Sequence, residues 1–504
     1  MELFDNVVLG FQAALSWDSL LFCALGVTLG TFIGVLPGLG SATGVALLLP
    51  LTLGMEPLHA LLMLAGIYYG CQYGASTSAV LIRTPGDPAS AVVTYDGYPM
   101  ARQGRAGQAL AVGTIASFIA GTLTVAVLML AAPAFAAVAV RFGAPEMFAL
   151  MLLGLLAVAG VSSGSPLKGL AMAALGLAIA TVGIDSQTGV ARFTFGQVQL
   201  YGGFGFIEIV IGIFAIGELL RRVGLPTVQP MRARLRDMVI SRRELRRTVP
   251  PALRHSVLGF LLGILPGGGA TLASFLSYET ERRISKNPEE FGKGRLEGVA
   301  APEASTNAAV NGSFVPTLTL GVPGSGTTAI LLGAFIVFGI VPGPMLMREQ
   351  PELVWGLMAS FWIGNLLLLA LNLPLAPAFA SVLRIPYRYL YPAIILLTLI
   401  GAFSIEYRLW GMWVALAFGL IGWLMMRYGY PVAPVVLGLV LGPLMEPELA
   451  RSLTISYGDP LVFVQRPISA ALLALGVLLL VGPTLWRRLR RRRRASTSAP
   501  SASA

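Results

Sequence analysis

Two stretches of the chain place Pro-Gly, further glycines and a hydroxyl where an apolar run would otherwise continue. Residues 34–44 read GVLPGLGSATG, and residues 263–274 read GILPGGGATLAS. Proline lacks a backbone donor and glycine accepts most backbone conformations, so each stretch is expected to break a helix. A new helix begins behind such a break, and its free N–H groups and positive dipole end attract anions. The two stretches therefore predict sites that bind a carboxylate without a buried arginine.

A second pair of motifs follows the first pair in the same order. Residues 74–90 read GASTSAVLIRTPGDPAS, and residues 311–328 read NGSFVPTLTLGVPGSGTT. The Pro-Gly dipeptides are 229 positions apart in the first pair and 238 positions apart in the second. This agreement in order and spacing indicates a duplicated chain with two equivalent halves.

The residues beside these breaks are the candidate substrate ligands. Glycine lets a backbone N–H approach a ligand, hydroxyls donate and accept hydrogen bonds, and arginine pairs bidentately with a carboxylate. The alternative for the small residues is close helix packing in lipid. For Arg83 the alternative is an ion pair with Asp87 or a place at the membrane interface, and its counterpart Gly321 excludes a symmetric role. The candidates are Gly38, Gly40, Ser41, Thr43, Ser76, Thr77, Ser78, Arg83, Gly267, Gly268, Gly269, Thr271, Pro323, Gly324 and Ser325.

A run of polar residues in the second half, residues 303–311, reads EASTNAAVN. On a helix, Glu303, Asn307 and Asn311 lie on one face. Polar groups inside a membrane protein are costly and usually face its interior. We therefore take Glu303, Thr306, Asn307 and Asn311 as candidate ligands of a coupling cation, either Na⁺ or H⁺. The alternative is hydrogen bonding between helices alone, with Glu303 as a cap or gate residue at the cytoplasmic mouth.

The composition places these motifs in a membrane protein. Of the 504 residues, 56% are hydrophobic and 12% are charged, and the mean hydropathy is +0.77. Soluble domains carry about 25% charged residues. No Lys or Arg precedes Arg83, so the first apolar run lacks the basic start of a cleaved signal peptide and is predicted to stay as a span. Cys23 and Cys71 indicate neither a disulfide framework nor a metal site.

The elements that must position the motifs are helices in a bilayer. A span needs about 20 apolar residues, and several apolar stretches here are shorter. The pattern predicts an all-α integral membrane protein with about 10–14 transmembrane or re-entrant helices, broken at the Pro-Gly motifs. The predicted domains are a first transmembrane half (1–220), an Arg-rich cytoplasmic loop (221–254), a second transmembrane half (255–486) and a basic, disordered cytoplasmic tail (487–504).

Basic residues are concentrated in two short stretches. Ten arginines lie between Arg221 and Arg254 and seven between Arg487 and Arg494, out of 35 Lys and Arg and a net charge of +11. Both stretches flank apolar runs, so the positive-inside rule explains them better than nucleic-acid binding does. The second half therefore starts in the cytoplasm, whereas the first half starts in a segment without Lys or Arg. We predict that the halves are inverted, as in many secondary transporters, and that the C-terminus is cytoplasmic.

The motifs together resemble the large membrane subunit of the bacterial tripartite tricarboxylate transporters, the TctA-type family. Beside the Pro-Gly motifs, the resemblance rests on YYGCQYG (68–74) and YDGYPMARQGRAGQAL (95–110), and it covers nearly the whole chain. It implies a permease subunit in the bacterial inner membrane that imports tricarboxylates or related carboxylates, driven by an ion gradient. It also implies two partners, a small TctB-type membrane subunit and a periplasmic TctC-type solute-binding protein.

Other classes fit the sequence less well. No G-x-x-x-x-G-K-[ST] loop is present to hold ATP, and no cofactor is expected. A serine hydrolase needs a base near Ser76 or Ser274, but the chain has only His59 and His255, with no recognisable orienting group. An anion channel, or a membrane scaffold subunit without its own substrate site, stays open as an alternative. A scaffold would leave the paired Gly/Ser/Thr breaks without a purpose.

Overall fold

The computed structural model describes residues 2–161, 165–185, 187–223, 230–231, 235–267 and 269–481. The candidate ligand Gly268 and the predicted tail 487–504 lie outside the described residues.

Helices make up most of the first part of the chain, because an apolar run in lipid must satisfy its backbone groups internally. The short strands Gly183–Ile184 (β1) and Ala191–Arg192 (β2) form an antiparallel hairpin, which the all-α prediction did not include. The helices are α1 (Glu2–Ala14), α2 (Trp17–Val35), α3 (Gly40–Leu48), η1 (Leu49–Thr52), α4 (Pro57–Ile82), η2 (Pro88–Tyr95), α5 (Gly97–Arg102), α6 (Ala106–Ala139), α7 (Ala144–Val161), α8 (Pro166–Ala180), η4 (Val198–Leu200), α9 (Phe206–Ile211), η5 (Gly212–Ile216) and α10 (Gly217–Arg222).

The second part is built in the same way. Its first long helix begins at Arg242, inside the stretch predicted as a cytoplasmic loop. The helices are η6 (Leu235–Met238), α11 (Arg242–Ile264), α12 (Gly269–Ile284), η7 (Pro288–Glu290), α13 (Glu297–Leu320), α14 (Gly326–Val337), α15 (Leu346–Glu349), α16 (Pro351–Val382), α17 (Tyr387–Glu406), α18 (Leu409–Arg427), α19 (Ala433–Ile455), α20 (Val462–Gln465) and a last helix, Pro467–Val481.

Six of the described helices are long and apolar enough to cross a membrane, namely α2, α6, α16, α17, α18 and α19. Shorter apolar helices, among them α7, α8 and α14, accompany them. The prediction of a helical, multi-pass membrane protein is therefore confirmed. The full number of crossings stays a prediction.

Each Pro-Gly motif separates two helices, as predicted. The motifs lie between α2 and α3, between α4 and η2, between α11 and α12, and between α13 and α14. Gly38 and Gly267 both have a positive φ, 68° and 114°, which glycine adopts far more readily than other residues.

Two helix pairs, α2 with α4 and α11 with α13, pack closely through glycine. A Cβ on Gly34 would overlap the backbone of Cys71, and a Cβ on Gly263 would overlap the backbone of Ala309. The second contact repeats the first at offsets of 229 and 238 positions, the same as those between the motifs. Small residues at such crossings let two backbones approach, which is how helices associate in lipid.

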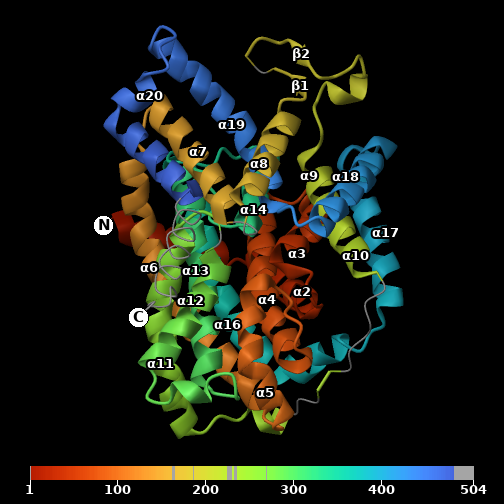
Figure 1. Cartoon of the computed structure of the whole chain (residues 1–504), viewed down its shortest axis with the longest axis vertical. Helices are drawn as coiled ribbons and strands as arrows, with labels where there is room; N and C mark the ends of the chain where they lie inside the picture. The colour runs from red at the N-terminus through yellow and green to blue at the C-terminus, as the bar shows by residue number, and fades with distance from the viewer. Residues whose placement is uncertain are drawn as a thin grey trace, which may run out of the picture.

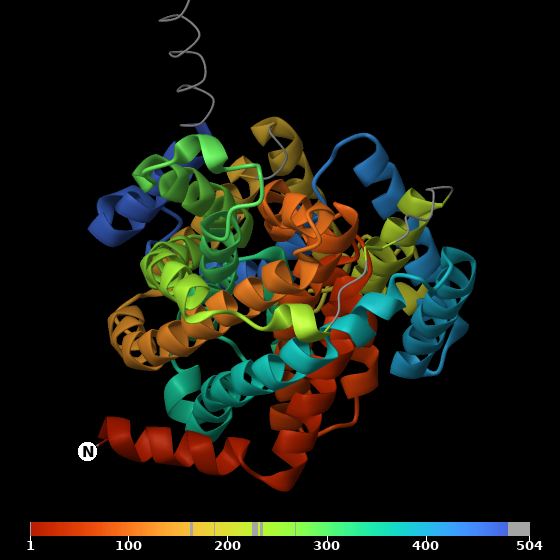
Figure 2. The ribbon, with the colours of Figure 1, turned by 90° about the horizontal axis from the view of Figure 1, so that it is seen from below.

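The breaks lie inside the molecule and not at its ends. Figure 1 shows α5 and the start of α11 at one end of the long axis, the β1–β2 hairpin and α20 at the other, and α3 and α14 between them. In the view along this axis, α1 lies at one edge beside α16, with which it is in contact, and α17 and α18 lie at the opposite edge (Figure 2).

Candidate functional site

The two Pro-Gly motifs of the first half form one folded unit. The Gly38 N–H donates a hydrogen bond to Pro85 O (3.1 Å), and the Gly86 N–H donates to Ala75 O (3.3 Å). A Cβ on Gly86 would also overlap the carbonyl oxygen of Gly34. The turn between α4 and η2 therefore closes over the turn between α2 and α3.

Asp87 places a carboxylate at the N-terminus of α3. Its Oδ2 accepts hydrogen bonds from the Ser41 N–H (3.0 Å) and the Ser41 hydroxyl (2.9 Å), and its Oδ1 accepts one from the Ala89 N–H (3.0 Å). The Asp87 side chain is buried, and among the described residues no cation, Arg83 included, forms an ion pair with it. The helix end that the sequence assigned to a substrate anion thus holds a carboxylate of the chain itself.

Hydroxyl groups from the first and the second part of the chain meet beside Asp87. Ser41 Oγ lies 2.9 Å from Thr327 Oγ1, and Tyr68 OH lies 3.3 Å from Ser325 Oγ. The Gln72 Nε2 amide group donates to Ser41 Oγ (3.3 Å). We call Ser41, Tyr68, Ser325 and Thr327 the hydroxyl cluster.

Three residues of this region were missed by sequence reasoning: Tyr68, Gln72 and Thr327. Tyr68 and Gln72 lie one helical turn apart in YYGCQYG, which served only as a mark of family resemblance. Thr327 follows Ser325 by two positions in the last Pro-Gly motif. Ser325 also caps α14, because its hydroxyl accepts from the Thr328 N–H (3.1 Å).

The two Pro-Gly motifs of the second half also touch. The Gly267 N–H donates to Gly324 O (3.1 Å), which joins the α11–α12 turn to Pro323 and Gly324. Gly269 opens α12 and is buried, whereas Thr271 is half-buried. The second-half candidates therefore divide, with Ser325 at the hydroxyl cluster and Gly267, Gly269 and Thr271 at the start of α12.

Four other candidates from the first part of the chain, Thr43, Ser76, Thr77 and Ser78, are buried. The Thr43 hydroxyl donates to Phe214 O (3.3 Å), and the Ser78 hydroxyl donates to Ala75 O within α4 (3.0 Å). Thr77 is buried, and Ser76 Oγ has no hydrogen-bond partner among the described residues. An unpartnered buried hydroxyl is costly, so Ser76 is the one of these four best suited to a ligand.

An arginine that was predicted only as a cytoplasmic charge lies at the first break. A Cβ on Gly38 would overlap the guanidinium group of Arg222, whose Nε donates to Glu218 Oε1 (2.9 Å). The Arg222 side chain is largely buried, and Tyr391 OH donates to its carbonyl oxygen (2.8 Å). The positive charge at the first break is thus already paired with Glu218.

The predicted cation ligands line one buried column between α13 and α6. The Asn307 Nδ2 amide donates to Ser117 Oγ (2.7 Å), and the Ser117 hydroxyl donates to Glu303 Oε2 (3.3 Å). The Asn311 Nδ2 amide donates to Thr124 Oγ1 (2.7 Å).

Three oxygen atoms of this column have no partner among the described residues: Glu303 Oε1, Asn307 Oδ1 and Asn311 Oδ1. Each belongs to a side chain that is at most 3% exposed. Thr306, also buried, is next to Asn307 in the chain. Hydrogen bonding between helices therefore accounts for the amide N–H groups of this column and for Glu303 Oε2, but not for these three oxygens.

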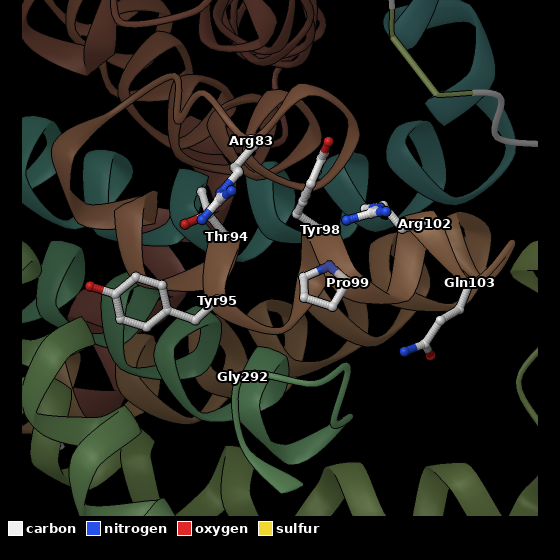
Figure 3. Close-up of a pocket in the computed structure, with 8 residues that line it drawn as sticks. All are labelled: Arg83, Thr94, Tyr95, Tyr98, Pro99, Arg102, Gln103 and Gly292. Atoms are coloured by element: carbon white, nitrogen blue, oxygen red, sulfur yellow. The ribbon is translucent and has the colours of Figure 1, made fainter.

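Arg83 lies apart from both groups. It is exposed, ends α4 in the left-handed conformation with φ of 58°, and places its guanidinium carbon 5.7 Å from the centre of the Tyr98 ring. It lines an open cavity of about 540 Å³ (Figure 3). The structure thus places Arg83 beside Tyr98 of α5, in the segment 95–110, and not beside the hydroxyl cluster.

A helical multi-pass membrane protein whose helices break inside the fold around buried polar side chains has the architecture of a membrane transporter. The family model for the tripartite tricarboxylate transporter TctA family matches residues 20–437. The chain belongs to this family, which is one of transporters and not of enzymes.

Two curated relatives from Agrobacterium vitis are similar to the chain. One, described as an uncharacterized 52.8 kDa protein in the TAR-I ttuC' 3' region, is 48% identical over 482 residues, covering 95% of this chain and 96% of the relative. The other, described as an uncharacterized protein in the TAR-II ttuC' 3' region, is 51% identical over 223 residues, covering 44% of this chain and 92% of the relative. No solved structure matches the chain.

Proposed function

We propose that this chain is the permease subunit of a binding-protein-dependent secondary transporter that imports tricarboxylates or related carboxylates. An ion gradient drives uptake by alternating access. The observation that carries the proposal is the contact between Ser41 and Thr327, because it joins the first break of one half to the last break of the other. A site built at such a junction changes shape when the two halves move.

The substrate site in this proposal is the hydroxyl cluster together with the neighbouring helix ends. Asp87 takes the N-terminus of α3, so the carboxylates of the substrate bind to hydroxyl groups and to the N-terminal end of α12. Ser325 stands where the first half has Asp87, at the offset of 238 positions, so this position in the second half carries no competing charge. The equivalent turns thus differ in charge in a way that favours an anion on the second-half side.

The coupling cation binds in the column of Glu303, Asn307 and Asn311. Carboxylate and amide oxygens are the ligands that hard cations prefer, and three of these oxygens lack a partner. Uptake that depends on a Na⁺ gradient and is lost in Asn307→Leu supports a Na⁺ site. Uptake that follows a pH gradient and is lost in Glu303→Gln supports a proton.

The two halves act as inverted repeats in this proposal. The matched crossings at Gly34 and Gly263, and the left-handed ends of α4 at Arg83 and of α13 at Gly321, support a common ancestry of the halves. Rocking of one half against the other then alternates access to the site. The chain lies in the bacterial inner membrane, works with a TctB-type subunit and receives its substrate from a TctC-type binding protein.

The test is citrate uptake in cells that express the chain with both partner subunits. Ser41→Ala and Thr327→Val each remove one hydroxyl without adding bulk, and each is expected to lower the uptake rate about tenfold. The matched controls are Ser360→Ala and Thr319→Val, because both hydroxyls are equally buried and bond only to their own helix. Membrane levels of all four variants should match the parent.

Two results would contradict the proposal. Normal uptake by both cluster variants would remove the hydroxyl cluster as the substrate site. Flux that rises linearly with citrate concentration and does not depend on the binding protein would instead favour the anion-channel alternative.

A further inference from the structure

A cavity of about 540 Å³ opens at the end of the molecule that carries α5, well within the roughly 300–1,000 Å³ of typical small-molecule sites. Tyr98 and Arg102 lie one turn apart on α5 and therefore on one face of it. Arg83 approaches from the end of α4, and in the view of Figure 3 Tyr98 lies between the two arginines. Tyr95 and Gly292 also line the cavity.

The cavity carries positive charge that the protein does not neutralise. Neither Arg83 nor Arg102 forms an ion pair with any described residue, and none of the lining residues is acidic. The Asp96 carboxylate is next to Tyr95 in the sequence, but it is buried and all its acceptor positions are directed to other groups. It accepts hydrogen bonds from the N–H groups of Gly294 (2.8 Å) and Arg295 (2.8 Å) and from the Tyr278 hydroxyl (2.8 Å).

The nearby glutamates are engaged as well. Glu297 accepts two hydrogen bonds from Arg247, both of 2.9 Å, and Glu290 pairs with Arg295. Asp96 also accepts from the Gly292 N–H (3.0 Å), which fixes the loop that forms the far wall of the cavity. The acidic side chains near the cavity are thus bound to other groups, and the described residues leave the charges of Arg83 and Arg102 unneutralised.

The backbone at Arg83 supports a role beyond packing. A non-glycine residue in the left-handed region costs on the order of 1–3 kcal/mol, persists only where the surrounding structure holds it, and is enriched at functional sites. The equivalent end of α13 has Gly321 in the same conformation, with φ of 67°. The first half thus keeps an arginine at a position where the second half uses the residue that fits without strain.

From these observations we propose that the cavity is a second anion site, which binds a di- or tricarboxylate between Arg83 and Arg102 at the cytoplasmic face. Two separate guanidinium groups suit an anion with at least two carboxylates, and the Tyr98 hydroxyl serves as a further donor. The inference rests on the proposed function for the identity of the anion and for the cytoplasmic orientation.

The orientation follows from the Arg-rich segment. Its Met231 N–H donates to Leu81 O (3.2 Å), two residues before Arg83, so this segment contacts the end of α4 from which Arg83 enters the cavity. Because such segments stay in the cytoplasm, the cavity faces the compartment into which substrate is released.

The cavity is also connected to the buried site. Arg83 is four residues from Asp87, and between them Pro85 O accepts from the Gly38 N–H (3.1 Å). An anion that binds Arg83 therefore restrains the turn 83–87, whose Asp87 caps α3. Internal substrate bound here slows further uptake.

The site is tested by binding of radiolabelled citrate to the purified full-length chain in detergent, without partners or gradients. Arg83→Gly and Arg102→Gln are each expected to weaken citrate binding at the cavity site at least about tenfold. The loss of affinity should be larger at low salt, where the charges are less screened. Arg83→Gly should leave the melting temperature equal or higher, because it relaxes the backbone. The control is Arg236→Gln, an exposed arginine paired only with its neighbour Asp237.

Unchanged citrate binding in both cavity variants would overturn the assignment. Displacement of citrate by inorganic phosphate as readily as by tricarballylate would also overturn it, since the cavity would then hold a phosphate or a lipid headgroup.

In proteoliposomes, citrate loaded inside should inhibit uptake by the parent but not by Arg102→Gln. Ser41→Ala should lose uptake and keep the cavity's citrate binding, so the two proposals fail separately.

Discussion

At the scale of single residues, the least expected feature is Asp87, a buried carboxylate held by N–H and O–H donors and by no cation among the described residues. Sequence reasoning treated it only as a partner for Arg83. The signal was available, because Asp after Pro-Gly and before Pro is a common helix cap. What the sequence did not reveal is that the same carboxylate caps a second helix, α3, from 46 positions away.

Asp87→Asn is expected to destabilise the folded protein by about 1–3 kcal/mol. In the parent, each Asp87 carboxylate oxygen accepts from a backbone N–H, one from Ser41 and one from Ala89. An asparagine has only one such oxygen, so in either orientation its NH₂ group faces one of these N–H donors. Thermal unfolding of the purified chain checks this. Asp237→Asn, with a partly exposed side chain, is the control and should change the melting temperature little. Equal melting temperatures would show that Asp87 does not hold the two turns together.

At the scale of elements, the start of α11 shows how a charged cap anchors a helix at the membrane edge. The Ser241 N–H donates to Glu244 Oε2 (2.8 Å), and Gln108 on α6 donates to Glu244 Oε1 (2.8 Å). The Ser241 N–H holds the pKa of Glu244 below its ordinary value of 4.5, against a smaller opposite effect of partial burial, with further help from the Ser241 hydroxyl and the charges of Arg105 and Arg247.

The sign of the pH dependence follows from this lowered pKa. A carboxyl that is more acidic in the folded state contributes stability above its ordinary value of 4.5 and loses it as pH falls through the folded pKa. Hydrogen exchange at Glu244 and Leu245, whose N–H groups donate to the Ser241 hydroxyl and carbonyl, should therefore quicken below about pH 4.5, after correction for intrinsic rates. Glu244→Gln should exchange faster at neutral pH and show no such step, and an unchanged profile in this variant would contradict the assignment.

At the scale of the whole molecule, the class was readable from the sequence and the assembly of the site was not. Composition and apolar runs predicted helices in a membrane, and Pro-Gly predicted each break, because both depend on local chemistry. Which breaks meet is a matter of tertiary packing. The pairing of Ser41 with Thr327, the burial of Arg222 at Gly38 and the removal of Arg83 to the cavity involve partners that no local pattern identifies.

Motion between the halves is tested by joining them. After Cys23 and Cys71 are replaced by alanine, Ser41→Cys and Thr327→Cys should form a disulfide, because the two hydroxyl oxygens lie 2.9 Å apart. Because both hydroxyls are lost, the reduced double variant should already take up citrate more slowly than the parent; oxidation should stop this residual uptake, and a reducing agent should restore it to the level before oxidation. Each single cysteine variant should be insensitive to oxidant. Full uptake by the cross-linked protein would contradict alternating access at this junction.

The contact between Ser41 and Thr327 also sets an order of events during synthesis, because 286 residues separate its partners. At about 5–20 residues per second, the ribosome needs roughly 15–60 s to make that length. During this interval α3 and its buried polar groups lie in the bilayer without the hydroxyl from α14. The unpaired polar groups of α3 are then exposed to membrane proteases. A chain that ends before α14 would never bury them and should be degraded.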